Sequence, residues 1–145
     1  MFIIGLDNGF LVKSDKRKLT RADLPVGIIY PFDKDYDGSP EIIYHRKDWG
    51  WRNSIMKEFG WKDVNMCDDI VDMRAYLIET PAQVLKLIEV TASWLNEEKW
   101  ENEGNSIWEY ESARRHLVED IINYSILYSF MQQNPDIFLE FYDSY

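Results

Sequence analysis

A long apolar repeat at helical spacing in the second half of the chain limits the possible folds more than any other feature. Residues 106–109, Ser-Ile-Trp-Glu, form a capping box, a pattern that begins helices. Apolar residues then recur every three or four positions: Tyr110, Ala113, Leu117, Ile121, Tyr124, Tyr128 and Met131. Because residues 121–131 are apolar nearly all round, they predict a buried central helix.

Local signals predict further helices around this one. A capping box with proline at the first helical position stands at residues 80–83, and an apolar face continues to about Glu98. Residues 52–59 predict a short helix, and residues 136–142, which follow Asn134-Pro135, predict a last one. Residues 64–77 are ambiguous, since their apolar positions fit a helical stripe only loosely.

The first half of the chain predicts β-structure. Residues 7–9, Asp-Asn-Gly, separate two apolar runs and predict a hairpin turn. Residues 26–32 and 41–46 predict two more strands. This order predicts an α+β fold, with an N-terminal, hairpin-rich antiparallel sheet of about four strands and C-terminal helices packed on one of its faces. We expect residues 1–145 to form a single domain.

Length and cysteine content indicate the compartment. A single cysteine, Cys67, excludes an internal disulfide and fits a reducing environment. The N-terminus lacks the basic stretch and long apolar run of a signal peptide, and no apolar run reaches the roughly 18–20 residues of a membrane span. We therefore expect a cytoplasmic protein that does not bind membranes.

The stretch at residues 33–41 resembles the first half of an EF-hand calcium loop. Asp33, Asp35 and Asp37 alternate and Gly38 follows them, as at positions 1, 3, 5 and 6 of that loop. The resemblance implies calcium as a cofactor, held by these three aspartates. Position 12 is Tyr44, however, which cannot supply the two oxygens of a glutamate. The stretch is also typical of a polar turn, which we favour over a cation site.

Catalytic motifs are scarce, and we expect no enzyme. The two histidines, His45 and His116, lie on different predicted elements, and neither follows a glutamate by three positions as in di-iron bundles. His116 shares one helix face with Glu119 and Asp120, which we interpret as a plain polar face. A small metal- or ligand-binding domain, or a hydrolase that uses surface carboxylates, is the alternative.

The net charge of −10 is unevenly placed along the chain. Residues 1–60 carry a net +1 and residues 61–145 a net −11. Such an acidic half repels nucleic acid and attracts basic proteins. We expect a non-enzymatic inhibitor that covers a basic surface on a toxin, a nuclease or a nucleic-acid-binding enzyme, as immunity proteins, antitoxins and phage inhibitors do. The expected contact residues are Glu97, Glu98, Trp100, Glu101, Glu103, Trp108, Glu109 and Glu111. A plain solvated face, whose charge serves solubility, is the other interpretation of this acidic stretch.

A second candidate surface is aromatic. Trp49, Trp51 and Trp61 lie within 13 residues of one another, around one short predicted helix. Tryptophan is enriched at binding hot spots, so exposed rings here would indicate an interface. Anchoring of the short helix in the core is the other interpretation.

Overall fold

The computed structural model describes residues 7–46, 49–61, 76–102 and 107–144, with the side chains of residues 49 and 107–109 outside the description. The elements follow in the order β1 (Asp7–Ser14), the short 3-10 helix η1 (Arg21–Asp23), β2 (Glu41–Arg46), α1 (Trp49–Glu58), β3 (Tyr76–Ile78), α2 (Pro81–Ser93), α3 (Glu97–Asn102), α4 (Ile107–Gln133) and β4 (Ile137–Ser144). Among the described residues, no helix is both long and apolar enough to cross a membrane.

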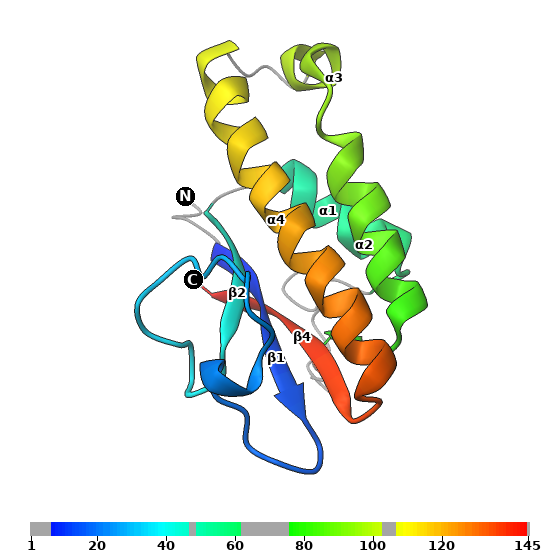
Figure 1. The fold of residues 1–145 in the computed structure, drawn as a ribbon. Helices are drawn as coiled ribbons and strands as arrows, with labels where there is room; N and C mark the ends of the chain where they lie inside the picture. Colours follow the sequence, from blue (N-terminus) through cyan, green and yellow to red (C-terminus); the bar gives the residue numbers. More distant parts are fainter. Residues whose placement is uncertain (1–6, 47–48, 62–75, 103–106, 145) are drawn as a thin grey trace.

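The α+β class is confirmed, but the strands are not all N-terminal. Four antiparallel strands form one sheet in the order β2-β1-β4-β3, so the last strand in the sequence lies inside the sheet (Figure 1). The helix predicted at residues 136–142 is therefore wrong. Ile137, Leu139 and Phe141 are buried at alternate positions, which is the period of a strand. β4 pairs with β1 along its whole length, from Ser14↔Ile137 to Asp7↔Ser144.

The hairpin turn predicted at residues 7–9 is also wrong, because β1 runs straight through them. Gly9 instead allows close packing of the neighbouring strands on β1. A Cβ atom at this position would lie 2.2 Å from the Ile43 carbonyl oxygen of β2 and 2.8 Å from the Tyr142 ring of β4. Glycine thus permits both neighbouring strands to approach β1 closely. In a single sequence, a glycine with this role looks the same as a glycine in a turn.

Residues 26–32 form a loop instead of the predicted strand. Gly27 has a φ of +104°, and the backbone of Ile29 is held by a side chain: its N–H donates to Asn123 Oδ1, and its carbonyl accepts from Asn123 Nδ2, both at 2.8 Å. The predicted strand at residues 41–46 is confirmed as β2, an edge strand of the sheet.

The short helix predicted at residues 52–59 forms as α1, which begins earlier, at Trp49, and the long helix predicted after the capping box forms as α4. Residues 62–75, and residue 106 of the predicted capping box, lie outside the described residues. The capping box of α2 forms as predicted: Gln83 N–H donates to Thr80 Oγ1 at 3.2 Å, and Thr80 N–H donates to Gln83 Oε1 at 3.1 Å. α2 ends at Ser93, earlier than predicted, and α3 follows it as a separate short helix. α4 buries Tyr124 and Leu127 but leaves Ile122 41% exposed. The predicted central helix is therefore buried on one side only.

Aromatic rings join the helices to the sheet. Phe10 of β1 makes edge contacts with Trp51 of α1 and Tyr124 of α4, with ring centroids 6.3 and 6.2 Å apart. Phe141 of β4, the register partner of Phe10, lies 6.3 Å from the same Trp51 ring. Because register partners share a sheet face, α1 packs on the face that α4 also contacts (Figure 1).

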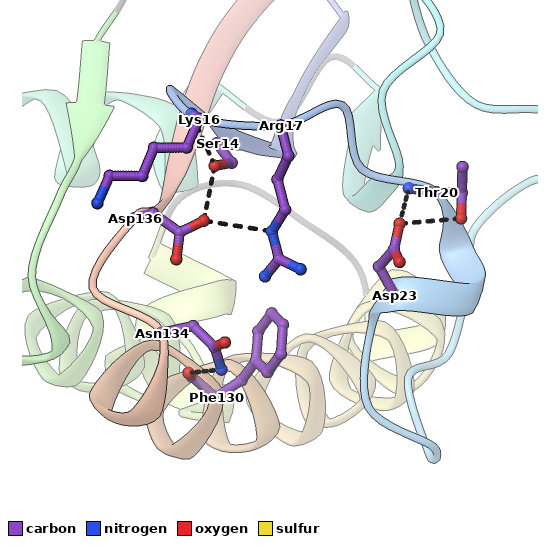
Figure 2. Close-up of polar contacts among 8 residues, drawn as sticks. All are labelled: Ser14, Lys16, Arg17, Thr20, Asp23, Phe130, Asn134 and Asp136. Carbon is purple, nitrogen blue, oxygen red and sulfur yellow. Dashed lines mark hydrogen bonds and ion pairs between the residues drawn. The ribbon is translucent and has the colours of Figure 1, made fainter.

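Two polar contacts fix the geometry around this core. Arg52 of α1 donates two hydrogen bonds to the Asp143 carboxylate, at 2.9 and 2.8 Å, and both side chains are buried. At the other end of β4, Asp136 accepts from Ser14 Oγ at 2.7 Å and from Arg17 Nε at 3.3 Å (Figure 2). The Ser14 hydrogen bond is the main reason that the pKa of Asp136 is lowered. These contacts hold both ends of the β1–β4 pair.

Candidate functional site

The predicted acidic contact residues lie partly on α3. Glu97, Glu98 and Glu101 are exposed, and we call these three residues the α3 acidic surface. In the described part of the chain, none of the three forms an ion pair. Lys99, the basic residue of this helix, makes its contacts elsewhere: its Nζ lies 4.1 Å from the centroid of the Trp94 ring and 3.1 Å from Ser93 Oγ.

Trp100 is placed differently from the expectation for a contact residue. It is 9% exposed, and its ring contacts Trp94 and Tyr110 edge-on, both with centroids 6.3 Å apart. Trp100 therefore anchors α3 to the core and is not available to a partner. Glu111 is exposed in α4, whereas Glu103 and the side chains of Trp108 and Glu109 lie outside the described residues.

Of the predicted aromatic interface, Trp51 is in the core and Trp61 is half-buried. Trp51 is fully buried, stacks on His45 with ring centroids 3.8 Å apart and donates its indole N–H to Thr91 Oγ1 at 3.2 Å. Trp61 is half-buried between Phe59 and Tyr76, and the side chain of Trp49 lies outside the description. For Trp51, core anchoring is the correct interpretation. A ring can be buried in this way because α1 packs directly on the sheet.

The aspartate stretch forms a tight turn. Asp37 and Gly38 have φ values of 53° and 73°, and Tyr36 and Ser39 form a β-bridge across them. Positive φ at both central positions is the pattern of a type I′ turn, which supports the turn interpretation. Arg21 Nε lies 2.7 Å from Asp35 Oδ1 and supplies positive charge to the loop. Within the described residues, Asp33, Asp35 and Asp37 do not form a group positioned to hold an ion.

Behind this turn lies a cavity of about 250 Å³, which we call the Glu41 cavity. Glu41 is only 2% exposed, and its carboxylate accepts a hydrogen bond from the Tyr142 hydroxyl. Burial, opposed by this hydrogen bond, raises the pKa of Glu41. Tyr44 donates to Asp7 Oδ2 at 2.8 Å, and burial is the first cause that raises the pKa of Tyr44 to about 12. Both tyrosines therefore stay protonated and act as hydrogen-bond donors.

The two histidines, which the sequence placed on separate elements, meet in the structure. His45 of β2 and His116 of α4 have ring centroids 4.7 Å apart, and His45 Nε2 lies 2.6 Å from Asp120 Oδ2. We call these three residues the His–Asp cluster. Sequence reasoning missed it because 75 residues separate His45 from Asp120. The only signal was the i, i+4 spacing of His116 and Asp120, which is common on polar helix faces.

Comparison with known proteins gives no match, whether to a family model, to a curated protein or to a solved structure.

Proposed function

We propose that this chain is a non-enzymatic acidic binding protein that covers a basic surface on a partner protein. The α3 acidic surface is the observation that carries the proposal, because its three neighbouring carboxylates are exposed and form no ion pair with described residues. The net charge of −10 adds a long-range field that attracts and orients a basic partner.

The partner class follows from the chemistry of carboxylates. Proteins that bind nucleic acid present Lys and Arg to phosphate groups, and a row of carboxylates can occupy the same positions. A toxin, a nuclease or another nucleic-acid enzyme is therefore the kind of partner that this surface fits. Glu111 adds a further exposed acid on α4. Glu103, Trp108 and Glu109 remain proposed contact residues on the basis of the sequence alone.

Charge reversal with a matched control tests the proposal. The test variant replaces Glu97, Glu98 and Glu101 by lysine, and the control variant replaces Asp15, Glu79 and Glu89, three exposed acids elsewhere in the chain. Both variants change the net charge equally, so a general loss of acidity is separated from loss of this surface. Each protein serves as bait in a lysate of the source cell, and the captured proteins are quantified by mass spectrometry.

The expected result is a basic partner that the wild type and the control variant retain and that the test variant loses by about tenfold or more, with affinity that falls as salt rises. Both variants should keep the wild-type circular dichroism, since exposed substitutions usually change stability by about 0.5 kcal/mol or less. Equal capture by all three baits, or capture of acidic proteins only, would contradict the proposal.

A further inference from the structure

The His–Asp cluster contains both histidines of the chain and gathers them with a carboxylate. His116 and Asp120 lie one turn apart on α4, and His45 reaches them from β2. One ligand atom from each of the three side chains lies within 4.8 Å of the other two. Within the described residues, no other set of three or more His, Cys, Asp or Glu is placed to hold a metal ion.

The hydrogen bond of His116 leaves the other ring nitrogen available for a ligand. His116 Nε2 lies 2.6 Å from the Tyr44 carbonyl oxygen, which can only accept, so Nε2 carries the proton. In the neutral imidazole, Nδ1 then keeps its lone pair for a ligand. A metal-bound histidine almost always donates its other N–H to a carbonyl or a carboxylate, and the Tyr44 carbonyl fills that role.

The contact between His45 and Asp120 is also compatible with a shared ion. Their side chains are 3% and 4% exposed, and the Nε2–Oδ2 distance is 2.6 Å. Two ligands of one zinc ion, at the usual bond lengths of about 2.0–2.2 Å, stand roughly 3 Å apart. An ion therefore requires a small opening of this pair and the release to solvent of the proton that His45 and Asp120 share. The stack on Trp51 holds the His45 ring in place.

A cavity gives the cluster an approach from one side. A cavity of about 250 Å³, which we call the His116 cavity, is lined by His116 and Asp120 together with Glu119, Asn123 and Tyr30, among others. His45 is buried and is not among the residues that line the cavity. Three protein ligands with one side open to a cavity leave room for a water molecule as fourth ligand, the arrangement of an open zinc site.

We propose that His45, His116 and Asp120 bind one divalent transition-metal ion, for which Zn²⁺ is the best match. Two imidazole nitrogens and one carboxylate oxygen suit Zn²⁺, Co²⁺ or Fe²⁺, whereas Ca²⁺ and Mg²⁺ prefer all-oxygen sites. This site is independent of the proposed function, because its residues are separate from the α3 acidic surface.

The test uses metal-free, full-length protein from which any histidine tag has been removed. Zn²⁺ binding is measured by calorimetry, and Co²⁺ binding by visible absorption, which reports nitrogen and oxygen ligands directly. His116→Gln is the decisive variant, since the glutamine amide can still donate to the Tyr44 carbonyl but cannot replace ring Nδ1. Glu119→Gln is the control, because Glu119 lines the same cavity but is not a proposed ligand.

Wild type and Glu119→Gln should bind one Zn²⁺ per chain with micromolar or tighter affinity, and His116→Gln should weaken binding on the order of 100-fold or more. Ring-proton NMR signals of both histidines should shift on Zn²⁺ addition. If His116→Gln does not fold by circular dichroism, Asp120→Asn takes its place with the same expectation. No Zn²⁺ uptake by the wild type at about 100 μM metal, or equal uptake by the ligand variant, would overturn the proposal.

Discussion

The α3 acidic surface and the His–Asp cluster place charged groups in opposite environments. Glu97, Glu98 and Glu101 are neighbours in sequence and face solvent, whereas His45 and Asp120 are distant in sequence and almost fully buried. Exposed carboxylates contribute little to stability and remain available to a partner. Buried polar groups need partners inside the protein, so their removal is felt by the fold. Changes in the α3 acidic surface should therefore affect partner binding with little change in stability, whereas changes among the buried residues should also affect stability.

The largest expected effect concerns the anchor beneath the α3 acidic surface. Trp100→Ala should lower the free energy of unfolding by about 3–5 kcal/mol, because it removes a large buried ring. Trp100→Phe should lower it by less, since the indole Nε1 makes no hydrogen bond with any described residue. Urea denaturation measures both. In the same assay Glu98→Gln should stay within about 0.5 kcal/mol of wild type.

An equal effect of Trp100→Ala and Glu98→Gln would contradict this division of α3 into a buried side and an outward side. It would mean that Trp100 does not hold the helix.

A smaller effect is expected at the edge of the sheet beside the His–Asp cluster. Asn123 Nδ2 donates to the Ile42 carbonyl of β2 at 2.7 Å, and the same side chain holds the backbone of Ile29. Asn123→Ala should lower the free energy of unfolding by roughly 2–3 kcal/mol, because it removes the partner of the buried Ile42 carbonyl and two further hydrogen bonds to the backbone of Ile29. Thermal unfolding followed by circular dichroism measures the loss.

Ser125→Ala is the control for this position. Ser125 is exposed on the same helix and donates to the Ile121 carbonyl within α4. A similar loss in both variants would show that the effect comes from the helix and not from the covered edge strand.

The sequence predicted those parts of the fold that local signals define. The Thr80–Gln83 capping box and the β2 strand need only neighbouring residues, and both form as expected. β4 could not be assigned in this way, because its eight residues become a strand by pairing with β1 more than 120 residues earlier. In the same way, the charge of the α3 acidic surface is visible in the sequence, while the burial of Trp100 and the meeting of His45 with Asp120 depend on contacts between distant elements.

The smallest expected effect compares an exposed with a buried carboxylate. Burial raises the folded-state pKa of Glu41 above its usual value of 4.5, so the folded protein binds this proton more tightly than the unfolded chain. Stability therefore decreases as pH rises from the unfolded pKa through the raised folded pKa, and at neutral pH the ionised carboxylate disfavours folding. Glu41→Gln should raise the melting temperature at about pH 7, since the amide oxygen can still accept from Tyr142.

The gain from Glu41→Gln should shrink toward zero below about pH 4, where the carboxyl is protonated in both states. Asp23 and Asp136 have lowered pKa values, which make the fold less stable in acid. Because both residues are present in wild type and in Glu41→Gln, the difference between the two melting temperatures reports the effect of Glu41. Glu98→Gln, an exposed substitution on the α3 acidic surface, should leave the stability within about 0.5 kcal/mol of wild type in the same assay. If Glu41→Gln were less stable than wild type at every pH, the ionised Glu41 carboxylate would be stabilising in its cavity. Burial would then not make Glu41 more destabilising than the exposed acids of α3.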